Sequence, residues 1–284
     1  MAKLKAGFIG FIPFNLQGDD YYKALEEYAA IGYKGTEHGA FLFNGDVDAN
    51  LARIKEIGIQ PIVMGMGGGR PGTPAPTMEE VAEKCHKIGV TRVATYTSAM
   101  AMFRFAAHMF PGPLSYDEVM KDIEQMEEKA TFFAKEGIDY MFHNHDTEIA
   151  CTFGGMNILQ LMYANTENLK FELDVGWVLA GGGDPVKYVH KYADRISALH
   201  IKNLRTDGWV YNARPDQPTP KYKSMMPRFT APGTGDLPLR EVLKAGVEHN
   251  IEWAIVEQDF MYHLTQKETL TCAYLNMKET GYVE

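Results

Sequence analysis

The sequence predicts an α/β fold, a closed (β/α)8 TIM barrel, from three observations. Short apolar runs typical of buried strands alternate with segments of helical periodicity along the chain. A glycine recurs where a predicted helix ends and the next predicted strand begins. The chain has 284 residues, which is close to the roughly 250 residues typical of an eight-fold barrel.

The junctions between helix and strand share one physical cause. Glycine, and less readily asparagine, takes the left-handed backbone conformation that ends a helix, and the apolar residue that follows starts a strand. The repeated order of helix, glycine and strand is typical of βα units on a parallel sheet. The junction residues are Gly32, Gly58, Gly89, Gly137 and Asn250.

Eight strands follow from the apolar runs, and caps and periodicity place the helices between them. The expected strands are residues 4–11, 34–37, 60–64, 91–96, 139–142, 169–173, 196–201 and 253–257. The first helix begins near Asp20, where apolar residues take up helical spacing. The second helix covers residues 47–57 and is capped by Asp46 or Asp48.

The later helices carry clearer start signals. Thr77 and Ser115 each precede a glutamate by three residues, which is the capping box that opens a helix. They predict helices over residues 77–88 and 115–135. Proline is favoured at the first helical position, and the pair Asp184-Pro185 offers such a start. The other helices are expected at residues 156–164, after residues 236–238, and at residues 266–280.

We expect a single barrel domain over residues 1–284, because no linker or low-complexity segment interrupts the pattern. A doubly wound open sheet is the alternative, but the glycine-rich phosphate loop of such folds is missing after the first strand. An extended loop after the strand at 196–201 covers residues 204–235 and is rich in aromatic residues and prolines. Loops of this length are usually functional, so we expect it to cover substrate or contact a partner; a surface segment packed on itself is the alternative.

The composition excludes several classes of function. The formal net charge of -9 repels phosphate backbones, and no basic patch offsets it, so we expect no nucleic-acid partner. No apolar run approaches the roughly 20 residues that span a bilayer, and the N-terminus lacks a secretory signal. We therefore expect a cytoplasmic protein with no membrane contact. The three widely spaced cysteines argue against a disulfide framework.

Ionisable residues gather where the last four predicted strands end, which is where the reacting groups of a parallel barrel lie. In chain order these residues are His143, His145 and Glu148, then Asp174, then His200 and Lys202, then Glu257. Buried groups of this kind are costly unless they are paired or bind a cation. Oxygen and imidazole ligands without thiolates favour Mn²⁺, Mg²⁺, Co²⁺ or Fe²⁺ and argue against structural zinc.

These residues form motifs that resemble a known family. The motifs are His143-Asn-His-Asp-Thr-Glu148, Leu173-Asp-Val-Gly-Trp177, Leu199-His-Ile-Lys-Asn203, Gly233-Thr-Gly-Asp236 and Ile255-Val-Glu257. Over nearly the whole chain they are similar to the xylose-isomerase-like TIM barrels, the sugar phosphate isomerase/epimerase superfamily. That superfamily includes ketose 3-epimerases, hydroxypyruvate isomerase, inosose dehydratase and C-glycoside-cleaving enzymes.

The resemblance implies one divalent metal ion, with Mn²⁺ the first expectation, held by residues from four consecutive strands. Its ligands on this chain would be Glu148, Asp174, His200 and Glu257. Many members of the family have a glutamate where this chain has His143, so Glu148, just beyond the strand, is the expected substitute. Ligation by His143 or His145 and a site with three ligands are the alternatives.

The resemblance also implies catalytic roles. In the family's epimerases two metal-bound glutamates serve as acid and base, a role that would fall to Glu148 and Glu257. A base from the imidazoles His143 or His145 is the alternative, and His145 could instead orient a ligand. Lys202 is expected to hold a substrate oxygen or an enolate. Glu37 and Trp177 are expected to contact substrate, with a structural ion pair as the alternative for Glu37.

The function implied is that of a metal-dependent sugar isomerase or epimerase, which removes a proton next to the carbonyl of a keto sugar or polyol. The alternative is a lyase, either an inosose-type dehydratase or a C-glycoside deglycosidase subunit that cleaves 3-keto-glucosides. The expected partners are a sugar or glycoside substrate and further copies of the chain in a homo-oligomer, with a small partner subunit as an alternative occupant of the long loop. A related DNA-repair endonuclease would need three zinc ions and a basic groove, and a non-catalytic barrel would not need the intact ligand set.

Overall fold

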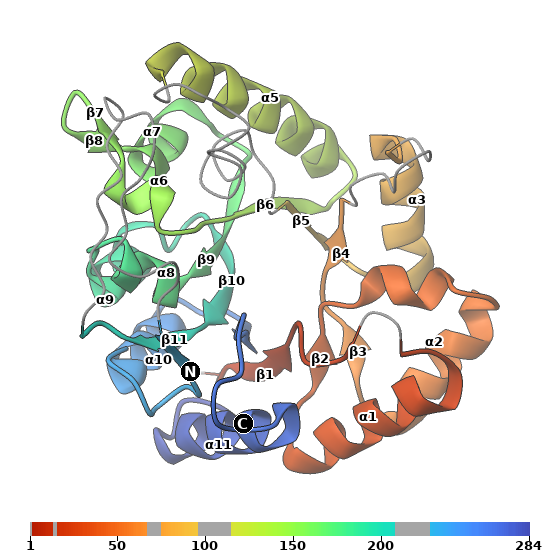
Figure 1. Ribbon diagram of the computed structural model, residues 1–284. Coiled ribbons are helices and arrows are strands. Elements are labelled where there is room, and N and C mark those ends of the chain that lie inside the picture. Colours follow the sequence, from red (N-terminus) through yellow and green to blue (C-terminus); the bar gives the residue numbers. More distant parts are fainter. Residues whose placement is uncertain (1, 14–15, 67–74, 96–114, 208–227) are drawn as a thin grey trace.

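The computed structural model describes residues 2–13, 16–66, 75–95, 115–207 and 228–284. Parallel strands form a central barrel with helices around its outside (Figure 1). The barrel strands are β1 (Lys5–Phe8), β2 (Gly35–Thr36), β3 (Gln60–Pro61), β4 (Met64–Gly65), β5 (Arg92–Thr95), β6 (Asp139–His143), β9 (Lys170–Asp174), β10 (Ile196–Ile201) and β13 (Trp253–Val256). Two antiparallel ribbons are added at the ends of barrel strands: β7 (Thr152–Phe153) with β8 (Met156–Asn157), and β11 (Asn203–Arg205) with β12 (Arg228–Thr230).

The helices follow the strands in chain order. They are α1 (Gly18–Ile31), the 3-10 helix η1 (Gly39–Phe43), α2 (Val47–Ile57), α3 (Met78–Ile88), α5 (Tyr116–Lys135), α6 (Thr147–Ala150), α7 (Ile158–Asn165), α8 (Val175–Ala180), α9 (Pro185–Lys191), α10 (Leu239–Glu248) and α11 (Gln266–Glu279). No helix in the described ranges is both long enough and apolar enough to cross a membrane.

The order of hydrogen-bonded strands shows how the barrel closes. It runs β3-β2-β1-β13-β10-β9-β6-β5-β4, and each pair is parallel. The two ends of this order, β3 and β4, belong to one chain segment, residues 60–65. The sheet therefore closes on itself through eight chain segments, and the predicted (β/α)8 TIM barrel is confirmed.

The predicted junctions and caps are confirmed. Gly58 and Gly89 end their helices with φ of 84° and 71°, and Asn250, with φ of 57°, is the one non-glycine residue with positive φ in the described part of the chain. Thr77 and Ser115 each complete a capping box. Local hydrogen bonding thus sets the helix ends from which the barrel strands start.

Some predicted boundaries are wrong by a few residues. The strand predicted at 4–11 is only β1, and the helix predicted at 156–164 begins at Ile158 because Asn157 caps it. The short helices α6 and α8 were not expected. Of the predicted long loop, residues 208–227 lie outside the described residues, while its two ends pair as β11 and β12.

An apolar layer fills the barrel below its mouth, which is the end at which the parallel strands finish. It includes Ile62, Ala94, Met141, Ala198, Trp253 and Ile255. Glycine makes room for it, because a Cβ on Gly35 would lie 2.6 Å from Ile62 and 2.9 Å from Trp253. Side chains two residues apart on a strand face the same side. Residues 143, 200 and 257 each stand two places after a member of this layer, so the fold stacks polar groups on an apolar floor.

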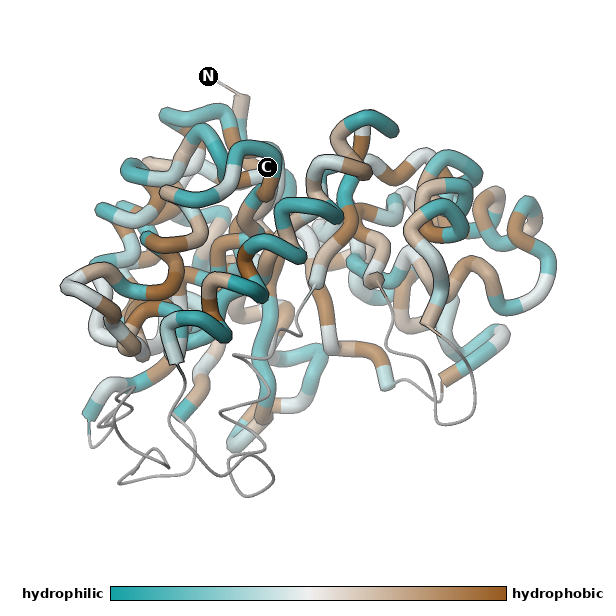
Figure 2. The backbone as a smooth tube through the Cα atoms, turned by 90° about the horizontal axis from the view of Figure 1, so that it is seen from above, coloured by the Kyte–Doolittle hydropathy of each residue, from teal (hydrophilic) through white to brown (hydrophobic). Residues whose placement is uncertain are grey.

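The two chain ends meet at the other end of the barrel from the mouth. Leu4 bridges Val283, and its N–H donates to the carbonyl oxygen of Tyr282 at 2.9 Å. Both ends lie on the same side of the molecule in Figure 2, where the outer turns of the helices are mostly hydrophilic. Because β1 starts beside them, this is the end at which the barrel strands begin.

Candidate metal centre

Four side chains from four neighbouring strands meet at the barrel mouth. They are His143 at the end of β6, Asp174 at the end of β9, His200 on β10 and Glu257 just after β13. One ligand atom of each lies within 4.8 Å of the others. His200 Nδ1 lies 2.9 Å from Glu257 Oε2, and His143 Nε2 lies 3.8 Å from both Asp174 Oδ2 and Glu257 Oε2.

Three predicted ligands, Asp174, His200 and Glu257, are thus brought together, with His143 as the fourth member of the group. Glu148, the predicted fourth ligand, lies on α6 and is fully buried. Its Oε2 accepts the backbone N–H of His145 at 2.6 Å. The Glu148 carboxylate therefore ties down the turn that follows β6.

Local hydrogen bonds fix how Asp174 is presented. The side chain of Asn144 both accepts the Asp174 N–H at 3.0 Å and donates to the Asp174 carbonyl oxygen at 3.2 Å. Asp174 Oδ1 accepts the Trp177 N–H at 2.7 Å and caps α8. Oδ2 is left facing the cluster, and burial raises the pKa of this carboxyl to about 7.

Lys202 is fully buried between carboxylates at the mouth. Its Nζ lies 2.8 Å from Asp259, 3.1 Å from Glu257 and 3.4 Å from Asp174. Burial acts against the charged amine, but these carboxylates outweigh it and raise the pKa of Lys202. The close approach of α8 requires Gly176, since a Cβ there would lie 2.5 Å from the Lys202 carbonyl oxygen. Lys202 is therefore a fixed positive charge at the mouth.

A buried glutamate that the sequence analysis missed, Glu172, lies behind the two histidines. Its Oε2 is 3.5 Å from His143 Nδ1 and 3.4 Å from His200 Nε2. The signal was present in the sequence, because Glu172 precedes Asp174 by two residues and so faces the same side of its strand. Glu37, a predicted substrate contact, places Oε1 2.8 Å from His200 Nε2.

The pKa values of His143, Glu172 and His200 are shifted in different directions. Burial lowers the pKa of His143 well below its ordinary value, and neighbouring His200 adds to the effect. Burial and Glu37 together raise the pKa of Glu172 to about 8. For His200, burial disfavours the charged ring, but Glu172 and Glu37 outweigh it and raise the pKa.

The residues at the mouth fit a divalent cation. Asp174 Oδ2 and both oxygens of Glu172 are buried without a close donor among the residues that the structure describes: Lys202 Nζ lies 3.4 Å from Asp174 Oδ2, and His200 Nε2 lies 3.4 Å from Glu172 Oε2. Buried carboxylate oxygens without donors are costly unless a cation compensates them. Two carboxylates and two imidazoles within 4.8 Å form a donor set that borderline divalent ions accept.

The remaining predicted residues surround this group. His145 is half-buried, and its ring centroid lies 5.0 Å from that of His143 and 5.4 Å from that of Trp177. Trp177 is fully buried, and Lys202 Nζ lies 4.8 Å from its ring centroid. The structure thus packs Trp177 against Lys202 and leaves His145 partly exposed.

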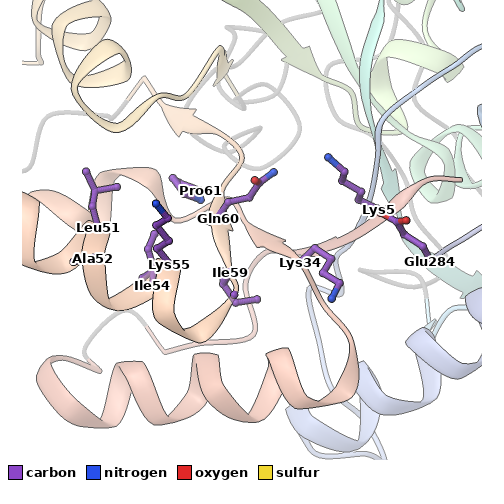
Figure 3. A pocket seen from close by; sticks show the side chains of 11 residues that line it. Lys5, Lys34, Leu51, Ala52, Ile54, Lys55, Ile59, Gln60, Pro61 and Glu284 are labelled. Carbon is purple, nitrogen blue, oxygen red and sulfur yellow. The ribbon is translucent and has the colours of Figure 1, made fainter. Parts of the chain in front are cut away.

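Two cavities lie at opposite ends of the barrel. One of about 390 Å³ opens beside the cluster and is lined by Glu37, His38 and Tyr21 among others. The other, of about 760 Å³, lies where the strands begin and is lined by Lys34 and Lys55 together with apolar side chains such as Leu51 and Ile59 (Figure 3). Glu37 joins the smaller cavity to His200, so of these two cavities the smaller one lies next to the candidate metal centre.

The carboxylate–imidazole group stands at the C-terminal ends of the strands, which is where the active sites of this fold lie. The chain belongs to the family of xylose isomerase-like TIM barrels, whose family model matches residues 25–268. Its homologues indicate an enzyme of that superfamily.

Individual relatives span most of the chain. The inosose dehydratase of Geobacillus kaustophilus is 28% identical over 262 residues, which are 85% of this chain and 82% of that protein. Matches to further inosose dehydratases cover about half of those proteins.

Solved structures at lower identity show the fold. A sugar phosphate isomerase/epimerase from Parabacteroides distasonis has a TM-score of 0.71 at 18% identity and covers 100% of both chains. The IolI protein, whose crystal structure holds a zinc atom, has a TM-score of 0.63 at 15% identity and covers 98% of this chain and 99% of its own.

Proposed function

We propose that this protein is a divalent-metal-dependent dehydratase, a carbon–oxygen lyase that acts on a keto polyol of the inosose kind. The observation that carries the proposal is the group His143, Asp174, His200 and Glu257, whose ligand atoms lie within 4.8 Å beside the half-buried His145. The match to an inosose dehydratase over 85% of the chain supports the choice of reaction.

The four grouped residues are the proposed ligands, so His143 takes the place expected for Glu148. Mn²⁺ is the proposed ion, because two carboxylates and two imidazoles form a mixed oxygen and nitrogen set. When bound, the ion supplies positive charge that polarises the substrate's carbonyl and adjacent hydroxyl oxygens. Metal analysis of the purified chain tests the identity of the ion.

His145 is the proposed acid and base, since it is the half-buried imidazole of the pair on this strand. It takes the proton from the carbon next to the carbonyl, and the electron pair of that C–H bond forms the new C=C bond. The hydroxyl on the following carbon accepts the same proton from the imidazolium and leaves as water, so atoms and charge balance. Lys202 stabilises the negative charge that develops on the carbonyl oxygen.

The cavity of about 390 Å³ beside Glu37 is the proposed substrate space. It is large enough for a six-carbon polyol ring, and small-molecule sites of roughly 300 to 1,000 Å³ are usual. Its exposed polar group Asn44 would bind ring hydroxyls, while Ile12 and Phe41 cover the apolar ring face.

A sugar isomerase or epimerase is the second candidate. Glu257 supports it, because its carboxylate joins the group from the end of β13, whereas His145 follows β6. The mouth therefore carries a second base on a different strand from His145, and two bases are what inversion of a carbon centre needs.

One experiment separates the two functions. The protein is incubated with keto polyols and keto sugars in D₂O with Mn²⁺, and products are followed by NMR and by absorbance of the conjugated enone. Loss of water with formation of the enone is the expected result. Deuterium at carbon without loss of water would establish the isomerase or epimerase instead, and neither outcome across the panel would refute both.

A further inference from the structure

We propose that Glu172 is the positioning residue of the metal centre: one carboxylate that receives the rear N–H of both His143 and His200. The inference rests on the proposed metal centre and assigns how its two imidazoles are held. Each ring turns one nitrogen to the cluster, Nε2 of His143 and Nδ1 of His200. The opposite nitrogens, His143 Nδ1 and His200 Nε2, lie 3.5 and 3.4 Å from the same oxygen, Glu172 Oε2.

The register of the barrel places Glu172 between the two rings. On β9 it pairs with His143 of β6 on one side, while Asp174, two residues on, pairs with His200 of β10 on the other. The other three strands of the group, β6, β10 and β13, carry Met141, Ala198 and Ile255 two places before their mouth residues, all buried and apolar. β9 alone among these four strands carries a carboxylate in that inner layer.

A carboxylate in that layer is costly for the fold. Glu172 is 0% exposed, and the imidazole nitrogens next to its Oε2 lie 3.4 and 3.5 Å away, which is long for a hydrogen bond. An apolar residue of similar size would be neutral or stabilising there if the charge had no partner. A role in the metal-bound protein accounts for this buried carboxylate, because a metal-bound histidine donates its other N–H to an acceptor behind it.

The chemistry of imidazole makes this acceptor specific. A neutral ring carries its proton on one nitrogen and can bind a metal only through the other. A single carboxylate behind both rings therefore selects the Nδ1–H tautomer of His143 and the Nε2–H tautomer of His200. Glu37 Oε1, 2.8 Å from His200 Nε2, is the nearer acceptor for that ring. Glu172 is the residue that lies within 3.5 Å of the rear nitrogens of both rings.

The test compares the full chain with Glu172→Gln and Glu172→Met. Mn²⁺ and Co²⁺ affinities are measured by competition with a chelating dye, and the Co²⁺ absorption spectrum reports the ligand field. Removal of such an outer partner typically costs about 10- to 100-fold in metal affinity. We expect that loss for Glu172→Met, a smaller loss for Glu172→Gln, whose amide oxygen still accepts, and a changed Co²⁺ spectrum for both. The melting temperature of the metal-free Met variant should equal or exceed that of the parent.

The matched control is Glu252→Gln, which removes a carboxylate from the far end of the barrel. It should lower the melting temperature and leave Co²⁺ affinity and spectrum unchanged. Parental affinity and spectrum in both Glu172 variants would overturn the inference, as would two ions per parental chain with one lost on Glu172→Gln, because Glu172 would then be a ligand. If the parental chain binds no divalent ion, the proposed metal centre itself fails.

Discussion

The two ends of the barrel both carry charged side chains, but they hold them in different ways. At the mouth, Glu172, Asp174 and His200 are 0% exposed. At the other end, Glu252 pairs with Lys5 at 2.9 Å and with Arg92 at 2.8 Å, and its side chain is 41% exposed. The charged groups at the strand starts form close ion pairs and also contact water. The charged groups at the mouth are shielded from water, and some of their oxygens lack a close donor among the described residues.

This difference separates stability from function within one fold. Partly exposed ion pairs stabilise a fold by about 1 kcal/mol or less, so a substitution at the strand starts should cost a small amount of stability. Buried carboxylates that lack donors weaken the fold unless something else compensates them. In parallel barrels the strand starts serve stability and the strand ends serve catalysis. Substitutions at the two ends should therefore move different observables.

Asp174→Asn should have the largest effect. The amide keeps an oxygen for the Trp177 N–H, so the start of α8 is preserved while the negative charge is lost. A metal ion supplies several kcal/mol to the transition state, so kcat/KM should fall by about a thousand-fold or more. Metal analysis and kinetics on one preparation check this. A variant that stays active with a full metal complement would show that Asp174 is not a ligand on which activity depends.

His145→Gln should have the next largest effect. It should distinguish the residues that bind the metal from the residue that acts as the base. Loss of a general base typically costs about 100- to 10,000-fold in rate, so kcat should fall within that range. Metal affinity should stay close to that of the parent, because His145 is proposed neither as a ligand nor as the acceptor behind a ligand. Kinetics and dye competition measure the two. A large loss of metal affinity with retained kcat would reverse the roles of His145 and His143.

The sequence predicted the framework of the fold well, because that framework depends on local chemistry. The left-handed turns at Gly58 and Asn250 and the capping boxes at Thr77 and Ser115 need only neighbouring residues. Boundaries set by distant contacts were harder. The segment at 60–65 is split into β3 and β4 because it pairs with β2 on one side and β5 on the other.

At the metal centre, strand period and strand order were enough to group Asp174, His200 and Glu257. They were not enough to choose between His143 and Glu148, because the direction of a side chain beyond a strand end depends on the turn. Here Glu148 turns back to the His145 N–H, a contact that no periodicity predicts. Glu172 was missed, although it lies two residues before Asp174 and its side chain therefore points to the same side of the strand.

At the far end, Glu252→Gln should change stability and leave activity as it is. Lys5 and Arg92 outweigh burial and lower the pKa of Glu252 below its ordinary value of 4.5, so the ionised form stabilises the fold. A partly exposed pair of contacts is worth about 1 kcal/mol, or about 2 to 4 °C in melting temperature. This loss should appear at pH 7 and shrink as the pH falls below 4.5, since the lowered pKa means the contribution is lost on protonation. Calorimetry across pH measures it; a difference that grows in acid would contradict this sign.

The smallest effect is expected for Lys34→Ala and Lys55→Ala, alone and together. Both lysines are exposed, line the larger cavity, and form no salt bridge with a described acidic residue (Figure 3). Surface substitutions of this kind usually stay within about 0.5 kcal/mol, so melting temperature, metal affinity and kcat/KM should all match the parent. The comparison holds only if the larger cavity is idle in the reaction. A fall in kcat/KM beyond about threefold in the double variant, with metal content unchanged, would show that the strand starts also serve catalysis.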